Sequence, residues 1–473
     1  MIKKSLLLLA AAMCLVLVPV SCEEAGPETP QEENQDQNQD QKPDEVPEEK
    51  PEKEEPIKLS KLTGEVPVVG DMIFSKRPEL TVQITNPNAV DVKVLLTMAV
   101  TTDKGVPAVT WSDSVLVAAS CVDDIEWTTN EDLAPGFYTV SCSINKKIAR
   151  TRNFGVDPFD IVSAPDMQDD FDEFWAAAKA QLPELIEGET FTLTKVSSDN
   201  YRTRYLVEMQ SVPNGPDGEP VIVRGYYAEP NDGKKHPVLM RFYGWDDGNS
   251  SGTGAYSQGP SEYAEFCLST RGQYLNRATS IGDGIKDNTD YASRNWFAFN
   301  FGDKDSFYYR GAFMDCVQAV RFMASRSTSD MNNLFAEGSS QGGALSYACA
   351  ALSDYPFTAI APNVAFLGDY PDYFDIVSWP GNVAKSNQGS MTDEQMYAFL
   401  SYFDTKNLAT RISAAVMASS GLNDTTCPPH TNFAPFNNLN TEDKVMIVGP
   451  TMTHDYPKTW NTDWQKFFKE RMK

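Results

Sequence analysis

The chain has 473 residues, which is long for one ordinary domain and suggests roughly two or three. Hydrophobic residues make up 41% of it and aromatic residues 11%, which is enough to bury a large core. The formal net charge of −26 argues against nucleic acid as a partner, because a phosphate backbone is bound by a basic surface.

The N-terminus has the pattern of a secretion signal. An apolar run, Leu6–Val20, follows a pair of lysines and is too short to span a bilayer comfortably. The run leads to Cys22 and is similar there to the lipobox of bacterial lipoproteins, although Pro19 stands where that pattern usually has leucine. We expect residues 1–21 to be a lipoprotein signal peptide and Cys22 to be lipidated. The protein would then be exported as an outer-membrane or cell-surface lipoprotein of a Gram-negative bacterium. A location on the periplasmic side is the alternative. The alternative is an ordinary signal peptide, with Cys22 an incidental thiol.

Residues 22–56 consist largely of Glu, Asp, Gln, Asn, Pro and Lys. A segment so poor in apolar residues cannot bury enough surface to offset its ordering entropy. Its like charges repel and extend it. We expect a disordered acidic tether, and part of the chain's acidity belongs to it.

Residues 57–156 contain short runs of β-forming residues separated by turn signals such as Asn86-Pro87-Asn88. The runs that predict strands include Leu80–Ile84, Val92–Leu96, Asp113–Val117 and Gly136–Val140. Roughly seven strands without a helical period favour a β-sandwich domain. We expect a spacer or packing partner, with sugar binding and oligomerisation as alternatives. Cys121 and Cys142 are the one disulfide pair we would suggest in an exported protein, although two unpaired thiols fit equally well.

Residues 157–473 alternate between strands and helices, which indicates a mostly parallel sheet with helices on both faces. Phe171, Phe174, Trp175 and Ala178 recur at the spacing of one helix face. The other predicted elements are strands at Tyr205–Met209, Val221–Tyr227, Pro237–Phe242, Trp296–Phe301, Leu334–Ala336, Ser413–Ser419 and Lys444–Val448, and helices at Phe313–Met323 and Ala344–Leu352.

The segment Gly338–Gly342 matches G-x-S-x-G, the elbow that presents a nucleophilic serine between a strand and a helix. The pattern alone is weak. Its context supports it, because an apolar strand precedes the segment and a run of small residues opens a helix after it. We expect Ser340 to be the nucleophile and the Gln341 backbone N–H to form one half of an oxyanion hole.

A serine nucleophile needs a base, and the chain has only three histidines. In an α/β-hydrolase the chain order is serine, acid, then histidine after the final strand. His236 precedes Ser340, and His430 lies only six residues after Asp424, on the same predicted loop. His454 follows the last predicted strand, so we expect it to be the base.

The acid should follow the strand at Ser413–Ser419, and Asp424 does. A carboxylate at this point can accept from the histidine ring and fix its tautomer. Asp369, Asp372 and Asp375 lie in an earlier stretch that reads as loop, where we expect them to shape the pocket or to be solvated.

The second oxyanion donor usually comes from a loop after an early strand. Tyr243-Gly244-Trp245 follows the predicted strand Pro237–Phe242, so we expect the Trp245 backbone N–H to be that donor. Trp245 could equally be an aromatic wall of the pocket, and the two roles are compatible.

Three motifs in order, Arg271-Gly272-Gln273, Gly338–Gly342 and His454-Asp455, resemble carbohydrate esterase family seven, the acetyl xylan esterase and cephalosporin C deacetylase group. The resemblance extends over about residues 158–473. Because the motifs occur as an ordered set, they are more specific than any single motif. It implies an α/β-hydrolase fold and deacetylation of small acetylated sugars and xylo-oligosaccharides. It also implies the same triad, with no metal and no cofactor.

Within this resemblance, Arg271, Gly272 and Gln273 are expected to be scaffolding beside the site. The chain departs from the family at two places. Tyr243-Gly244-Trp245 replaces His-Gly-Tyr, which makes Tyr243 a candidate pocket residue, and His454-Asp455 replaces His-Glu. The family's hexamer is uncertain here, because a lipid tether and an added β-domain change the packing surface, so a homo-oligomer stays an open expectation.

Two alternatives have different sequence requirements. A peptidase of the prolyl-oligopeptidase kind shares the fold and the triad order, but it usually carries a propeller or a larger lid domain. A non-catalytic glycan-binding surface lipoprotein would not need an intact set of Ser340, Asp424 and His454.

Overall fold

The structure, a computed structural model, describes residues 62–215, 218–245, 261–273 and 296–473. They belong to one unit of the chain, Ile57–Lys473. The predicted signal peptide, Cys22 and the acidic tether lie outside the described residues. Among the helices in these ranges, none combines the length and the apolar character needed to cross a bilayer.

The N-terminal strands form two sheets, ordered β1-β3-β6 and β2-β8-β7-β4-β5. Their bounds are β1 Thr63–Glu65, β2 Ile73–Phe74, β3 Glu79–Asn86, β4 Val92–Thr102, β5 Pro107–Val117, β6 Cys121–Thr128, β7 Gly136–Ile144 and β8 Lys147–Val156. Alternate residues of β4 are buried, because successive side chains of a strand point to opposite faces. Their apolar side chains and those of β3 and β7 share one core, so the predicted β-sandwich is confirmed.

The suggested disulfide does not form. Cys121 is exposed on β6 and Cys142 is buried on β7, so the two residues belong to different sheets, and both thiols are free. Strand-like sequence around each cysteine could not reveal this, because strand propensity does not say which side chain is exposed and which is buried.

The second region is built on one nine-stranded sheet, ordered β17-β16-β15-β14-β12-β13-β11-β10-β9. Pairing is parallel from β17 through β13 and antiparallel from β13 to β9. The strands are β9 Phe191–Ser198, β10 Arg202–Ser211, β11 Val221–Pro230, β12 His236–Phe242, β13 Ala264–Ser269, β14 Ser329–Ser339, β15 Ala359–Asn363, β16 Ala415–Gly421 and β17 Lys444–Gly449. The predicted α/β fold is therefore confirmed, with an antiparallel extension at one edge.

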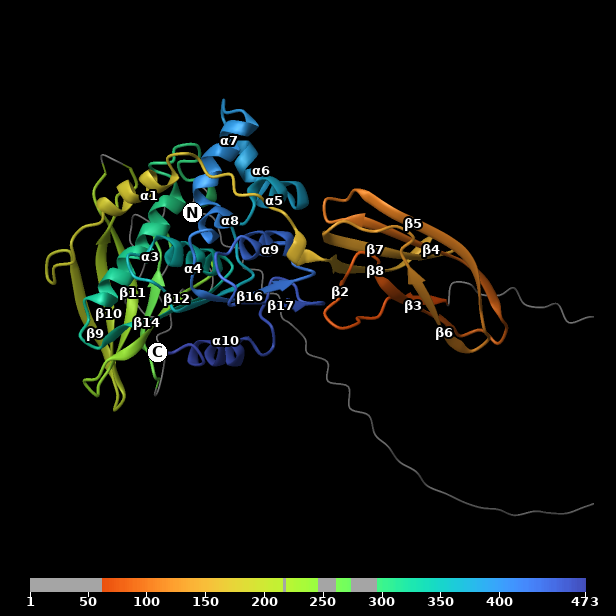
Figure 1. The fold of residues 1–473 in the computed structure, drawn as a ribbon, viewed down its shortest axis with the longest axis horizontal. Coiled ribbons are helices and arrows are strands. Elements are labelled where there is room, and N and C mark those ends of the chain that lie inside the picture. The colour runs from red at the N-terminus through yellow and green to blue at the C-terminus, as the bar shows by residue number, and fades with distance from the viewer. Residues whose placement is uncertain (1–61, 216–217, 246–260, 274–295) are drawn as a thin grey trace, which may run out of the picture. The chain divides into compact units, whose positions relative to one another are not determined.

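Helices cover both faces of this sheet (Figure 1). They are α1 Phe171–Ala180, α3 Tyr308–Ala324, α4 Gln341–Leu352, α5 Tyr370–Ile376, α6 Ser378–Asn387, α7 Asp393–Leu400, α8 Thr405–Ala409, α9 Pro429–Asn437 and α10 Trp460–Lys469. The aromatic face of α10 packs on one side of the strands, whereas α1, α3 and α4 share the large core on the other. Both apolar faces of the central strands are thereby removed from water.

Two predicted elements are wrong. Trp296–Phe301 is not a strand, because only Trp296–Ala298 is regular, as one turn of 3-10 helix, and its aromatic rings fill the core and a neighbouring aromatic cluster. Asp372 and Asp375 do not lie in a loop, because they belong to α5, whereas Asp369 is the residue directly before that helix. Asp369 is also buried, at 4% exposure, rather than solvated. Short aromatic or mixed runs have no period that separates strand from helix.

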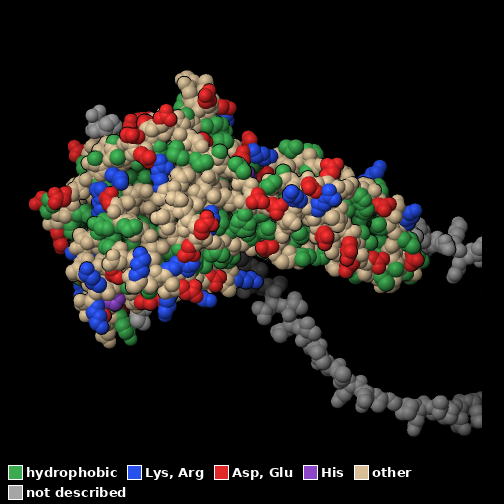
Figure 2. Space-filling model, in the orientation of Figure 1, with side chains coloured by type: hydrophobic (Ala, Val, Ile, Leu, Met, Phe, Trp, Pro, Cys, Tyr) green, Lys and Arg blue, Asp and Glu red, His purple; other side chains and the backbone are tan. Residues whose placement is uncertain are grey.

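Figure 2 shows one face of the protein, on which Lys and Arg side chains are interspersed among Asp and Glu side chains. That face therefore carries charges of both signs.

Candidate active site

Ser340 lies at a sharp turn between β14 and α4, with φ 58° and ψ −119°. Such a conformation is strained for a residue with a side chain, so the surrounding structure must enforce it. A Cβ on Gly338 would lie 2.4 Å from the Gly342 oxygen, and one on Gly342 would lie 2.0 Å from the Phe242 oxygen. Gly338 is therefore required by the tightness of the turn itself, and Gly342 by the close approach of β12.

The structure brings Ser340, His454 and Asp424 together. His454 Nε2 lies 2.9 Å from Ser340 Oγ, and His454 Nδ1 lies 2.8 Å from Asp424 Oδ2. A carboxylate only accepts, so Nδ1 donates to Asp424 and leaves Nε2 able to accept the serine proton. Ser340 and His454 are partly exposed, whereas the Asp424 side chain is fully buried, so solvent reaches the reacting end of this arrangement.

The loops that carry Asp424 and His454 hold each other in place. Asp424 Oδ1 accepts the backbone N–H groups of Thr426 at 2.8 Å and Cys427 at 2.9 Å. The Asn423 N–H donates to the Met452 carbonyl at 3.0 Å, which joins the two loops directly. The second carboxylate oxygen of Asp424 is thus left for the histidine.

Asn363, at the end of β15, is a supporting residue that sequence reasoning missed. Its backbone oxygen accepts the Ser340 N–H at 2.9 Å, and its Nδ2 donates to Ser339 Oγ at 2.7 Å and to the Asp455 carbonyl at 3.3 Å. The Ser419 hydroxyl donates to its Oδ1. Asn363 is fully buried and links the serine turn to the histidine loop. The only available signal was its position at a strand end.

Gln341 and Trp245 are the two predicted oxyanion donors. Gln341 is the first residue of α4, and the first N–H groups of a helix have no partner within it. The segment before Trp245 runs beside the serine, because a Cβ on Gly244 would lie 3.6 Å from Ser340 Cβ. Both backbones therefore lie near the turn, and their roles as oxyanion donors stay predictions.

Trp245 also has an aromatic environment. Its ring stacks on Trp296, with centroids 4.1 Å apart and planes 10° from parallel, and meets Tyr308 edge-on at 5.9 Å. The ring centroid of Trp296 in turn lies 6.0 Å from that of Trp379, on α6. A cluster of aromatic rings thus adjoins the segment that passes the serine.

Tyr243 belongs to a different cluster. Its side chain packs with Leu206, Tyr226 and Cys267, and its hydroxyl donates to Cys267 Sγ at 3.8 Å. A role for Tyr243 in the pocket stays a prediction.

Arg271 is buried at 1% exposure and pairs with Asp315 on α3. Its Nη2 lies 2.6 Å from Asp315 Oδ1 and its Nε 3.0 Å from Oδ2. Gly311 is needed for this pair, because a Cβ there would lie 2.1 Å from Arg271 Nη1. Gly272 has φ 84°, which only glycine adopts readily.

Gln273 connects this buried pair to the serine turn. Its Nε2 donates to Gln341 Oε1 at 3.0 Å and to Thr270 Oγ1 at 3.1 Å. Arg271 and Gln273 thus contact buried groups near the elbow, and the scaffolding role of Arg271, Gly272 and Gln273 stays a prediction.

Cys427 and Tyr373 also adjoin the triad, and sequence reasoning gave neither a role. Burial raises the pKa of the Cys427 thiol well above its usual value, the charge of Asp424 raises it further, and hydrogen bonding to Tyr373 and Ser340 opposes the shift. A thiol with a raised pKa is unreactive at neutral pH. Cys427 therefore packs beside the serine as an inert neighbour.

The β-sandwich contacts the loop that carries Asp424. Asn153 Nδ2, on β8, donates to the Leu422 carbonyl at 2.8 Å and to Asn423 Oδ1 at 3.1 Å. Leu422 and Phe433 belong to the core of the sandwich. The added region is thus packed directly against the acid loop and α9.

The site combines a serine on a strand-to-helix elbow, a carboxylate after a later strand and a histidine after the last strand of a largely parallel sheet. This combination defines a serine hydrolase of the α/β-hydrolase class. Residues 161–472 match the acetyl xylan esterase family (AXE1), which is well over half of the chain. The chain belongs to that family and is a carboxylic ester hydrolase, so the predicted family resemblance is confirmed.

Individual relatives agree with this assignment. Acetyl esterase Axe7A of Xylanibacter ruminicola is 27% identical over 349 residues, which are 72% of this chain and 75% of that protein. An acetyl xylan esterase structure from Paenibacillus sp. R4 is 26% identical with a TM-score of 0.54, covering 66% of this chain and 98% of its own. Acetyl xylan esterase 1 from Thermoanaerobacterium sp. JW/SL YS485 shares the fold at 24% identity and a TM-score of 0.52, covering 66% of this chain and 96% of its own.

Proposed function

We propose that the protein removes acetyl groups from small acetylated sugars, acetylated xylo-oligosaccharides foremost, through an acetyl-enzyme on Ser340. The observation that carries this proposal is the continuous contact from Ser340 Oγ through His454 to Asp424, at 2.9 and 2.8 Å. The names of the relatives support the acyl group and the substrate class.

In the first half of the reaction, His454 Nε2 takes the Ser340 proton while Oγ attacks the acetyl carbonyl carbon. Asp424 stabilises the imidazolium and holds its tautomer. The Gln341 and Trp245 amides donate to the oxyanion as it forms. The sugar alkoxide then leaves with the proton held by His454, and the acetyl group stays on Ser340.

In the second half, a water molecule takes the place of the sugar hydroxyl. His454 accepts its proton, the hydroxide attacks the acetyl-enzyme, and acetate leaves as Ser340 recovers its proton. The stacked Trp245 and Trp296 rings offer an apolar surface against which a sugar ring can lie.

The test is acetate release from acetylated xylo-oligosaccharides, other acetylated sugars and esters of longer acids, alongside p-nitrophenyl acetate. We expect hydrolysis of p-nitrophenyl acetate, preference for acetyl esters of sugars, and loss of activity in Ser340→Ala. Wild-type turnover no faster than that of Ser340→Ala would refute the catalytic proposal. Preferred release of longer or aromatic acids would refute the substrate.

The location of the protein is a separate proposal, based on the sequence around Cys22. Lipidation of Cys22 would anchor the chain to a bacterial membrane, with residues 23–56 as its tether. We expect Cys22→Ala to move the protein from the membrane fraction to the soluble fraction. An unchanged partition would refute the anchor.

A further inference from the structure

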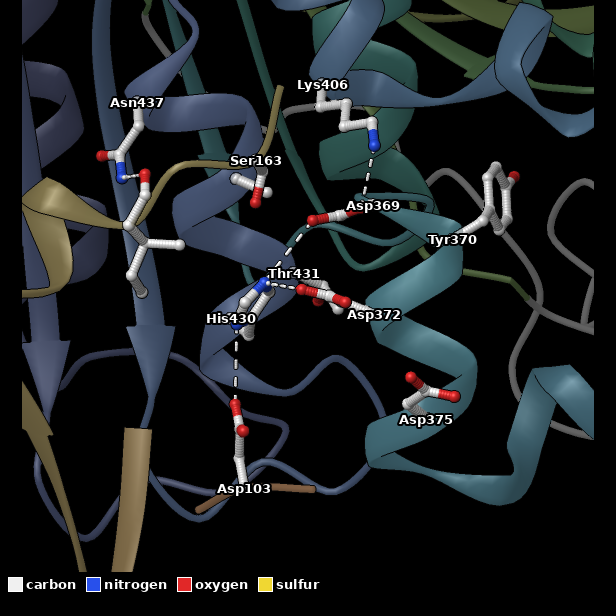
Figure 3. Close-up of polar contacts among 12 residues, drawn as sticks. Asp103, Ser163, Asp369, Tyr370, Asp372, Asp375, Lys406, His430, Thr431 and Asn437 are labelled. Carbon is white, nitrogen blue, oxygen red and sulfur yellow. Dashed lines mark hydrogen bonds and ion pairs between the residues drawn. The ribbon is translucent and has the colours of Figure 1, made fainter. Parts of the chain in front are cut away.

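His430, the second residue of α9, lies against carboxylates from two other elements (Figure 3). Its Nε2 is 2.9 Å from Asp372 Oδ2 and 3.5 Å from Asp369 Oδ2, both at α5. Its Nδ1 is 3.6 Å from Asp103 Oδ2, in the turn between β4 and β5 of the sandwich. Two elements remote in sequence from α9 thus converge on its imidazole.

The two α5 carboxylates divide their oxygens in the same way. Asp369 Oδ1 accepts from Lys406 Nζ at 2.9 Å, and Asp372 Oδ1 accepts from Lys104 Nζ at 2.5 Å. The Oδ2 atom of each carboxylate is turned to His430 Nε2 instead. One nitrogen and two oxygens, from His430, Asp369 and Asp372, therefore converge within 4.8 Å of one another.

These contacts are not hydrogen bonds. Within the described part of the chain, His430 Nε2 is inaccessible to solvent and has no partner with hydrogen-bond geometry, and the residue as a whole is only 8% exposed. A buried ring nitrogen is costly when it is left unsatisfied. The separations of 2.9 and 3.5 Å suit a different arrangement. Ligands bound at about 2.0–2.2 Å lie about 3.0 Å apart at right angles and about 3.4 Å apart in a tetrahedron.

Asp103 completes the expected surroundings of a metal-bound histidine. A ligating imidazole usually donates its other N–H to a carboxylate, which fixes the ring and raises its basicity. Asp103 Oδ2 occupies that position at Nδ1 and, among the described residues, has no hydrogen-bond partner. A small rotation of either side chain would bring the two atoms into hydrogen-bond range.

We propose that His430, Asp369 and Asp372 bind a divalent first-row transition metal, zinc foremost, which joins the β-sandwich turn to α5 and α9. An imidazole with two carboxylates suits such an ion better than calcium or magnesium, which prefer oxygen ligands throughout. The role is structural, because deacetylation by Ser340, His454 and Asp424 needs no metal. The ion would hold α9, which begins directly after the Asp424 loop.

The local charge favours a cation. The basic groups here are Lys104, Lys406 and His430. They are outnumbered by the carboxylates around them, which are Asp103, Asp166, Asp369, Asp372, Asp375 and Asp404. A proton is the competing occupant of Nε2. Burial lowers the pKa of His430, but the surrounding Asp103, Asp369 and Asp372 outweigh burial and raise it to about 11. Metal ions bind the neutral imidazole, so zinc affinity should fall as the pH is lowered.

The metal content of the full chain is first measured on the protein as purified. The protein is then treated with a chelator, and zinc binding is measured by calorimetric titration and by the change in thermal unfolding. We expect saturable binding of one zinc ion per chain and a rise in Tm. In His430→Ala both should be lost. His236→Ala is the matched control, because His236 also has a carboxylate neighbour, Asp232 at 2.8 Å, but lies on β12 outside this cluster.

If His430→Ala does not fold, Asp372→Asn serves instead, with an expected loss of about 10- to 100-fold in zinc affinity. Wild-type protein that binds no zinc, or a His430→Ala variant that binds it unchanged, would overturn the proposal and leave the proton as the occupant. Ser340→Ala should bind zinc like the wild type, so failure of the esterase proposal and failure of this one are distinguishable.

Discussion

Two of the three histidines, His454 and His430, differ in what faces the second ring nitrogen. In His454, Nδ1 is 2.8 Å from Asp424 and Nε2 meets the Ser340 hydroxyl. In His430, Nδ1 is 3.6 Å from Asp103 and Nε2 meets two further carboxylates. The side chain of His454 is 29% exposed and that of His430 only 10%.

The difference shows that a histidine–carboxylate pair does not by itself specify a chemistry. Next to a neutral hydroxyl and solvent, an imidazole can accept and return a proton during a reaction. Next to several carboxylates, the same ring favours a bound cation, which is a proton or, as we propose, a metal ion. Asp424→Asn and Asp103→Asn test the two histidine arrangements, whereas Arg271→Met and Gly342→Ala test the buried support and the turn of the serine site.

Asp424→Asn should lower kcat by about 10⁴-fold with little loss of structure, because the amide no longer fixes the histidine tautomer. Its oxygen can still accept from the Thr426 and Cys427 amides. Steady-state kinetics on p-nitrophenyl acetate, with circular dichroism as the folding control, would measure this. A loss smaller than tenfold would mean that Asp424 is not the acid.

Arg271→Met should lower the free energy of unfolding by about 3–5 kcal/mol, because it leaves the fully buried Asp315 without its cation. The cation that pairs with Asp315 is the Arg271 side chain itself, so added zinc should not restore the stability of the variant. Urea denaturation gives the value. The double variant Arg271→Met/Asp315→Leu should recover part of the loss, and no recovery would contradict the ion-pair explanation.

Gly342→Ala should destabilise the protein by about 1–3 kcal/mol or more and impair catalysis, because its Cβ would lie 2.0 Å from the Phe242 oxygen. Gly215→Ala is the control, since the nearest atom to its Cβ among the described residues would be Ser306 Cβ at 3.6 Å. Thermal unfolding and kcat would be compared for both. Equal behaviour of the two variants would show that the elbow tolerates a side chain.

Asp103→Asn should raise the zinc Kd by about tenfold, the low end of what loss of a carboxylate behind a metal-bound histidine costs. Asp424→Asn, the same chemical change beside the other histidine, should leave the zinc Kd unchanged. Calorimetric titration of the two variants would decide. An equal effect of both would mean that the two histidines are not independent.

Much of the catalytic arrangement was predictable from the sequence. The G-x-S-x-G segment, three histidines and the chain order of the fold led to Ser340, Asp424 and His454, which the structure places within hydrogen-bonding distance. The helix at Phe171–Ala180 follows from its apolar period. These inferences succeed because a turn, a helix face and an order of elements are encoded locally.

Contacts between remote segments were not predictable. The contacts of Asn363, of Cys427 and of the Arg271–Asp315 pair depend on which strand ends and helix faces lie next to each other. The strand predicted at Trp296–Phe301 was wrong because its aromatic rings pack into an aromatic cluster instead.

The sequence by itself determined the class of fold, the family and the three residues of the triad, since these depend on short motifs and their order. Only the tertiary structure decided that Asp369, Asp372, Asp103 and His430 meet. These residues are far apart along the chain. Burial strengthens the electrostatic interactions among them, and it exists only once the regions have packed together.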